Sequence, residues 1–295
     1  MSEEDFIINA FCLVEDELKK LTKPLRQRGF APALSDSEVI TMEIVAEFLG
    51  IDTDKGCWQF FRTHYRHYFP HLGSKANFAK QAANLFAVKL SLQTMLARRL
   101  GAKEDLLHLC DGFPMPVCHF RRANFSHVFK DQASFGFCAA KREIYYGFKG
   151  NLLIDSKGVI SGLTLTAANI DERESLWDII SDIQGDIIAD KGLIGKDYQA
   201  ELYHETGIIL HTAVRDNMHE DRSAHFIKWL KSTRRLVETV IGQLTERFHI
   251  EKVRARKLWS LINRTARKIL AHTLACFINY QSGNPLLQFD RIITL

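Results

Sequence analysis

The chain has 295 residues, of which 46% are hydrophobic and 25% charged, and its net charge is +4. This composition suits an ordinary globular protein of one or two domains with ample apolar residues for a core. The acidic start Met1–Asp5 has the wrong charge for a signal peptide and no apolar run is long enough to span a bilayer, so we expect a cytoplasmic protein with no membrane partner.

Six cysteines are present, and none of them forms a Cys-x-x-Cys pair. Most lie in apolar runs, which is typical of buried free thiols in a reducing compartment.

Residues 1–100 are predicted to be all-helical. Ser35 and Glu38 have the spacing of a capping box at the start of one helix. A second helix is expected over 54–69, rich in aromatic and basic residues, and a third over 75–100. Short helices with such residues suit a DNA reader of the helix-turn-helix type. The alternative is a helical bundle that only packs against the rest of the chain.

The region after residue 103 alternates between strand and helix patterns. The apolar run 106–111 reads as a strand that ends on Asp111, and Gly112 follows it. Pro114 and Pro116 argue against a central strand beyond that point, so a loop or a sheet edge is expected there.

A basic, aromatic connector follows at residues 119–130 and includes Arg121 and Arg122. Such a segment can stack on or follow a nucleic acid strand, or it can be an ordinary surface loop.

Two β-rich runs, 145–154 and 159–166, are separated by a turn sequence that begins at Asp155. They predict a hairpin in which Asp155 is a turn residue and not a metal ligand. A helix is expected over 172–183 and a further strand over 208–212.

The run 186–190 is a short apolar strand that opens on Asp186 and ends on Asp190. Ligands and metal ions bind at the carboxyl ends of central strands in α/β sheets, so Asp190 is a candidate ligand. Asp186 lies at the opposite end of the strand and is expected to be structural.

A helical pattern contains the third candidate acid, Glu238. Apolar residues at 237, 241, 244 and 248 define one helix face, and Glu238 lies beside it. Lys231, Arg234 and Arg235 precede Glu238 by one or two turns and share its side of the helix.

Asp111, Asp190 and Glu238 together form an all-oxygen ligand set. Hard oxygen ligands suit Mg²⁺ or Mn²⁺, and a pair of such ions supports phosphodiester chemistry. Each acid alone is equally typical of a strand end, a helix cap or a solvated helix face. Glu246 and Glu251 are weaker candidates, because the first lies two turns beyond Glu238 and the second lies near the helix end.

Basic residues concentrate near this glutamate. Residues 222–268 contain thirteen Lys or Arg and three Glu, a net charge of +10, so the rest of the chain carries −6 of the total of +4. A basic block of this kind is typical of a polyanion site, although it can also be a solvated helix surface. The sequence shows no zincin-type histidine pair, no phosphate-binding glycine loop and no Gly-x-Ser-x-Gly elbow.

Several blocks of the sequence resemble DDE transposases of the insertion-sequence 982 family. The residues that carry the resemblance are Cys110–Cys118, Phe135–Lys149, Leu163–Ile170, Ala189–Gly192, Arg234–Glu238, Phe248–Ile250 and Arg254–Arg256. The likeness extends from about residue 30 to 280, and the combined blocks are far more specific than any one of them.

The resemblance implies an α/β fold: an RNase H-like mixed sheet flanked by helices, preceded by an all-helical domain. It implies a DNA-binding domain at 1–100 and a catalytic domain at 101–295 with a basic helical C-terminal part. Asp111, Asp190 and Glu238 would be the catalytic residues and would hold two Mg²⁺ or Mn²⁺ ions. DNA contacts would come from basic residues on the motifs: Lys231, Arg234, Arg235, Arg247, Arg254, Arg256, Arg121 and Arg122.

The implied function is a transposase that binds the terminal inverted repeats of an insertion sequence, cleaves DNA and transfers the strand to target DNA. A homodimer or larger assembly on DNA, in the cytoplasm and nucleoid of a prokaryote, is the corresponding expectation. The alternatives are a catalytically inactive DNA-binding remnant and an RNase H-like nuclease without strand transfer.

The sequence departs from related transposases at three positions. Lys231 stands where a Tyr is expected and Thr245 where a Lys is expected, so either the DNA contact of that Lys passes to a neighbour such as Arg247 or the pattern does not apply. Asn151 stands where a histidine is expected.

Overall fold

The computed structural model describes residues 1–21, 31–139, 141–215 and 218–293. Residues 22–30 of the predicted helical region and residue 140 of the central motif lie outside this description. The chain divides into two compact units, one formed by residues 1–96 with 244–295 and the other by residues 97–243. The C-terminal segment, expected above to continue the catalytic domain, therefore packs with the N-terminal helices.

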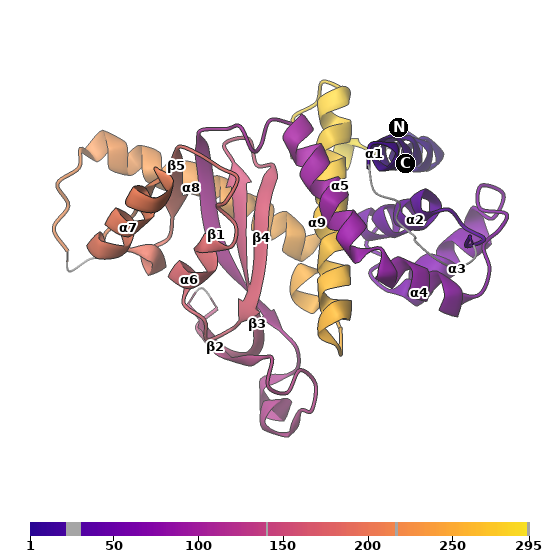
Figure 1. Cartoon of the computed structure of the whole chain (residues 1–295), viewed down its shortest axis with the longest axis horizontal. Coiled ribbons are helices and arrows are strands. Elements are labelled where there is room, and N and C mark those ends of the chain that lie inside the picture. The colour runs from indigo at the N-terminus through magenta and orange to yellow at the C-terminus, as the bar shows by residue number, and fades with distance from the viewer. Residues whose placement is uncertain (22–30, 140, 216–217, 294–295) are drawn as a thin grey trace. The chain divides into compact units, whose positions relative to one another are not determined.

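The first unit is helical throughout the residues described (Figure 1). Its elements are α1 (Glu3–Lys19), α2 (Asp36–Phe48), α3 (Asp54–His64), α4 (Lys75–Asn84), most of α5 (Phe86–Arg99), the 3-10 turn η3 (Ile250–Lys252), α9 (Leu258–Gln281) and η4 (Phe289–Arg291). The predicted capping box is confirmed, because the side chains of Ser35 and Glu38 each bond the other's backbone N–H at the start of α2.

A buried ionic network ties α2 to the other helices of this unit. Glu47 of α2 is 1% exposed and accepts hydrogen bonds from Arg267 and from Lys268 of α9, the latter at 2.6 Å. Glu43, one turn earlier, pairs with the buried Lys89 of α5. The network requires charges of both signs, because an unpaired buried charge is costly.

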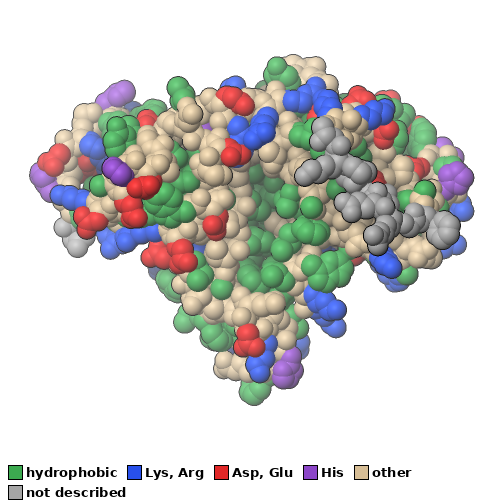
Figure 2. All heavy atoms as spheres, viewed as in Figure 1, with side chains coloured by type: hydrophobic (Ala, Val, Ile, Leu, Met, Phe, Trp, Pro, Cys, Tyr) green, Lys and Arg blue, Asp and Glu red, His purple; other side chains and the backbone are tan. Residues whose placement is uncertain are grey.

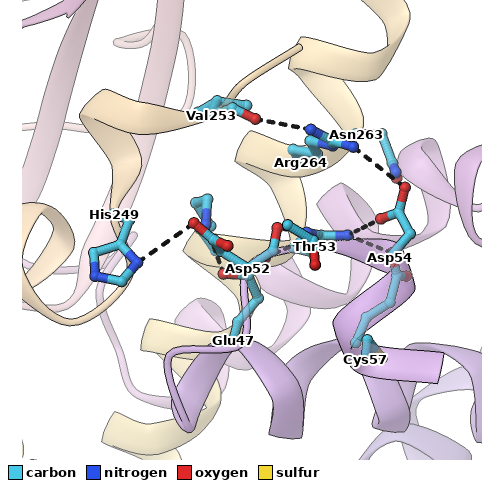
Figure 3. A network of polar contacts seen from close by, with 12 residues as sticks. Glu47, Asp52, Thr53, Asp54, Cys57, His249, Val253, Asn263 and Arg264 are labelled. Atoms are coloured by element: carbon cyan, nitrogen blue, oxygen red, sulfur yellow. Dashed lines mark hydrogen bonds and ion pairs between the residues drawn. The ribbon is translucent and has the colours of Figure 1, made fainter. Parts of the chain in front are cut away.

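The same network extends to Asp52 and Asp54, around the start of α3 (Figure 3). Asp54 pairs with Arg264 at 3.3 Å, and Arg264 also donates to the carbonyl of Val253 at 2.9 Å. His249 Nδ1 lies 3.5 Å from an oxygen of Asp52. These contacts join the start of α3 and Asp52 just before it to α9 and to the residues that flank η3.

Two helix predictions for the first unit need correction. The helix expected over 54–69 ends at His64, and residues 65–69 form tight turns. The helix expected over 75–100 is broken at Leu85 into α4 and α5. At the break the carbonyl of Ala82 accepts from Leu85 N and also from the buried ammonium of Lys89 at 2.9 Å. Lys89 is further bonded to Glu43 and Asn263.

The second unit is built on a six-stranded mixed sheet. Its strands are β1 (Leu107–Pro116), β2 (Ser134–Cys138), β3 (Glu143–Asp155), β4 (Ile160–Ala167), β5 (Asp186–Ala189) and β6 (Ile209–Thr212). The order is β2-β3-β1-β5-β6, and β4 pairs with β3 beside β2. The β1–β3, β2–β3 and β3–β4 pairs are antiparallel, whereas β1–β5 and β5–β6 are parallel. The predicted hairpin and the two later strands are thus confirmed.

After Asp111 the chain forms the sheet edge and not the loop, the two alternatives that the prolines left open, because β1 beyond Leu109 pairs only with β3 among the described strands. Strand β1 continues to Pro116, pairs with β3 along its length and lies between β3 and β5. The prolines are tolerated because β5 pairs only with Leu107–Leu109. Val117 N donates to Tyr146 O of β3, so the alternate positions 114 and 116 direct their missing N–H groups away from β3, where no strand needs them.

The remaining elements of the second unit are helical. They are η1 (Phe120–Phe125), α6 (Glu172–Trp177), η2 (Lys191–Leu193), α7 (Lys196–Thr206) and most of α8 (Ala224–Glu246). The helix expected over 172–183 is wrong beyond Trp177. Residues 178–183 turn instead, and three β-branched residues with poor helix propensity, Ile179, Ile180 and Ile183, enter the core beneath β5.

Candidate active site

Asp111 and Asp190 lie toward the carboxyl ends of the neighbouring parallel strands β1 and β5. In the parallel β1–β5 pair Leu109 is in register with Ile188. Asp111 lies two residues after Leu109, and Asp190 lies two residues after Ile188. Because side chains alternate along a strand, residues i and i+2 point to the same face. The two carboxylates therefore project from the same face of the sheet as Leu109 and Ile188. The juxtaposition of the two aspartates expected from the sequence is therefore present.

A single guanidinium bridges the two aspartates. Arg234 of α8 places Nη1 2.9 Å from Asp190 Oδ1 and Nη2 3.2 Å from Asp111 Oδ2. Its Nε is buried and has no hydrogen-bond partner among the described residues. Two carboxylates from neighbouring strands thus converge on one cation delivered by a helix.

The environment of Asp111 opposes its ionisation. Burial raises the pKa of Asp111, and the negative charge of Asp190 adds to this effect, while Arg234 and the Gly112 N–H, which donates at 2.9 Å, oppose it. Burial also disfavours the charged form of Arg234, but the charges of Asp111 and Asp190 outweigh burial and raise the pKa of Arg234. The guanidinium therefore stays charged in the site.

Glu238 lies one helical turn after Arg234 and is exposed. Its negative charge adds to the larger effects of Asp111 and Asp190 that raise the pKa of Arg234. Among the residues that the structure describes, no three His, Cys, Asp or Glu side chains are gathered closely enough to hold a metal ion. Asp111 and Asp190 thus converge on Arg234, and the three predicted acids do not form a common ligand cluster.

Two further polar residues, Glu172 and Asn151, lie near the aspartates; the sequence did not mark Glu172 as a site residue, and it marked Asn151 only as a departure from an expected histidine. A β-carbon on Gly112 would lie 3.3 Å from Glu172 Oε1 and 3.3 Å from Asn151 Oδ1, and one on Gly192 would lie 2.5 Å from Glu172 Oε2. The Glu172 carboxylate therefore lies against the residues that follow Asp111 and Asp190. A side chain at either position would require the Glu172 carboxylate to shift.

Glu172 is paired with Lys149 of β3 at 3.5 Å. The sequence marked residue 172 only as the start of a helix, after the N-cap Asp171, whose side chain accepts from Arg173 N. Its nearness to the site depends on how α6 packs, which no local pattern encodes. Asn151 is buried and in register with Gly112 across the β1–β3 pair, and its Nδ2 has no hydrogen-bond partner within the described part of the chain.

The basic residues predicted to contact DNA lie in several places. Lys231 and Arg235 are exposed on α8 near Arg234, and Arg121 and Arg122 are exposed on η1. In the other unit, Arg254 and Arg256 are exposed, whereas Arg247 pairs with Asp290 and lies over the ring of Phe48 at 4.9 Å. Arg247 is thus already engaged within its own unit.

Comparison with known families gives this site its context. Residues 101–258, more than half of the chain, match the family described as the transposase DDE domain. The chain belongs to this family, which implies transposase activity with DNA as the partner. No curated protein and no solved structure matches the chain. Within the described ranges, no helix has both the length and the apolar character needed to cross a membrane.

Proposed function

We propose that this chain is a transposase of the insertion-sequence 982 type, with Asp111, Asp190 and Glu238 as its catalytic acids. The main support is the convergence of Asp111 and Asp190, two residues beyond a parallel strand pair, on a helix that also carries Glu238. The strand order and directions, with an antiparallel β1–β3–β4 meander extended by parallel β5 and β6, support an RNase H-like fold.

The chemistry of the donor set fits a divalent metal. Asp111 and Asp190 already direct carboxylate oxygens at one cation, and carboxylate oxygens are the ligands that Mg²⁺ and Mn²⁺ prefer. We propose that these two aspartates and Glu238 hold two such ions. When bound, a metal pair activates the attacking oxygen and stabilises the leaving oxygen in phosphodiester cleavage.

The basic side chains have positioning roles in this proposal. Lys231 and Arg235 lie exposed beside the acids on α8 and bind backbone phosphates of the element end. Arg234, which bonds both aspartates, contributes to positioning the phosphates beside them. Arg121, Arg122, Arg254 and Arg256 extend the DNA contacts, and the N-terminal helices bind the terminal repeats. The assembly is a homodimer or larger on DNA, in the cytoplasm and nucleoid of a prokaryote.

The test uses the purified protein and a plasmid that carries the gene with its native flanks. We expect nicks in the flanks with Mg²⁺ or Mn²⁺, none with EDTA, and loss of cleavage by at least about a hundredfold in Asp111→Asn, Asp190→Asn and Glu238→Gln. Folding and DNA binding should persist in all three variants. Normal cleavage by all three would refute the assignment of the acids.

The products separate the alternative functions. Joined molecules in which the cleaved end is attached to target DNA identify a transposase, whereas cleavage without joining identifies a nuclease. Binding to the flanks without cleavage under any metal condition identifies an inactive remnant.

A further inference from the structure

An exposed aromatic surface lies on β2, at the end of the sheet path. Phe135 and Phe137 are 44% and 65% exposed, and as residues i and i+2 of one strand they lie on the same face. Ile144, which is in register with Phe137 on β3, is 54% exposed. Phe120 of η1 packs edge-on against Phe135 with ring centroids 6.1 Å apart. These four residues are called the β2 aromatic face below.

The glycine between the two phenylalanines shows which face of the strand is open. A β-carbon on Gly136 would lie 2.7 Å from both the β-carbon and the carbonyl oxygen of Ala168, so the chain covers that side of β2. The phenylalanines project from the other side. Phe135 is also held by the ring of Tyr146, 5.1 Å away, which fixes its position without covering it.

The segment that contains the β2 aromatic face carries a net positive charge. Residues 119–144 carry two acids, Asp131 and Glu143, and five basic residues, Arg121, Arg122, Lys130, Lys141 and Arg142, all exposed. Figure 2 shows hydrophobic, basic, acidic and histidine side chains together on the projecting segment at the bottom of the view, below β2 in Figure 1. A symmetric contact between two copies would bring these like charges together, whereas a polyanion would neutralise them.

We propose that the β2 aromatic face binds unpaired bases of single-stranded DNA. Two rings on alternate residues of a strand stand about 6.6 Å apart, and each offers a flat face to one base. Sheet surfaces that combine such aromatics with surrounding cations bind single strands by stacking and by phosphate contacts. The inference rests on the proposed function, since an opened element end supplies the single strand.

The experiment measures fluorescence anisotropy of a labelled oligothymidylate and of a labelled duplex, in EDTA so that no cleavage occurs. Phe135→Ala and Phe137→Ala should each weaken binding of the single strand by about tenfold or more, with a much smaller effect on the duplex. Phe137→Tyr keeps a ring and should keep the affinity, whereas Phe137→Leu keeps an apolar side chain and should lose it. Tyr203→Ala, an exposed aromatic on α7, is the matched control and should change nothing.

Unchanged affinity for the single strand in the Phe135→Ala, Phe137→Ala double variant would overturn the proposal. So would a change from dimer to monomer in sedimentation with unchanged single-strand binding, because the surface would then be an interface between copies. Cleavage of the native flanks in Mg²⁺ is measured separately on the same wild-type protein. Cleavage without single-strand binding would refute this inference and leave the proposed function intact.

Discussion

At the scale of single residues, Arg234 is the clearest difference between expectation and structure. The sequence indicated that Arg234 shares a helix side with Glu238 and assigned it to phosphates of DNA. In the structure its guanidinium bonds both Asp111 and Asp190. Periodicity placed the residue on the correct helix side, but its partners depend on how α8 lies against two strands distant in sequence, and no local pattern contains that information.

The bridge predicts that Arg234 competes with metal ions for the two aspartates. Arg234→Gln removes this cation, so Mn²⁺ affinity measured calorimetrically should rise by about tenfold, or ~1.4 kcal/mol. In EDTA the same variant should lose about 1–2 kcal/mol of unfolding free energy, because two neighbouring carboxylates lose a half-buried partner.

The matched control for this prediction is Arg235→Gln, which removes an exposed charge from the next position of the same helix. It should alter neither metal affinity nor stability in EDTA by a measurable amount. Equal Mn²⁺ affinity of wild-type protein and Arg234→Gln would show that the guanidinium does not compete with the metal.

At the scale of elements, the strands that were predicted well are those whose signal is local. The β3–β4 hairpin has two β-rich runs and a turn sequence between them, and β5 and β6 are short apolar runs bounded by turn residues. The strand predicted from the sequence ends at Asp111 because Pro114 and Pro116 normally exclude a central strand, whereas β1 continues to Pro116. Its tolerance of proline arises from the early end of β5, a fact about tertiary pairing that the sequence pattern does not reveal.

The turn between β3 and β4 supports the reading of Asp155 as a turn residue. Its Oδ1 accepts from Val159 N at 2.7 Å and from Lys157 N at 2.9 Å, while Oδ2 is buried without a partner among the described residues. Burial raises the pKa of Asp155 to about 6, against the hydrogen bonds from these two N–H groups. The folded chain therefore favours the protonated form of the Asp155 carboxyl more than the unfolded chain does.

This pKa gives a pH-dependent prediction for Asp155→Asn. Because the folded pKa is raised, the contribution of Asp155 to stability is fully present below about pH 4, the unfolded value, and is lost as the pH rises through about 6. Asparagine keeps the accepting oxygen and carries no charge. In urea unfolding the variant should be more stable than the wild type by about 1–3 kcal/mol near pH 8 and about equal to it near pH 4.

Asp105 provides a control of opposite sign beside the same turn. Burial opposes its ionisation, but bonds donated by Ser156 and by Leu107 N outweigh burial and lower the pKa of Asp105. Its stabilising effect is present above its unfolded pKa and is lost as the pH falls below it, so Asp105→Asn should destabilise the protein near pH 8. A gain in stability from Asp155→Asn that is the same at both pH values would contradict the assigned cause.

At the scale of the whole molecule, the sequence predicted helices at both ends but not that they form one unit. Residues 1–96 and 244–295 pack together, and 97–243 form the inserted α/β unit. The basic block at 222–268 was read as a polyanion site, yet Arg267 and Lys268 within it are 2% and 1% exposed and neutralise Glu47. Composition counts charges without showing which of them face each other in a core.

The discontinuous unit leads to a prediction about fragments. Residues 1–100 alone should not fold cooperatively, because α9 supplies both apolar surface and the partners of Glu47. Without Arg267 and Lys268, a buried carboxylate loses its counter-charges, which typically costs about 3–5 kcal/mol, comparable with the whole stability of a small domain. Circular dichroism on heating should show weak helix content and no sharp transition.

Residues 1–96 joined through a flexible linker to 244–295 should instead melt in one cooperative transition. Glu47→Gln in this joined chain tests the cause, since it removes the charge but keeps the length of the side chain, and it should lower the melting temperature markedly. If the fragment 1–100 melts as sharply as the joined chain, the N-terminal helices form a domain by themselves. The buried charges of α9 would then be an addition to that domain and not the condition for its folding.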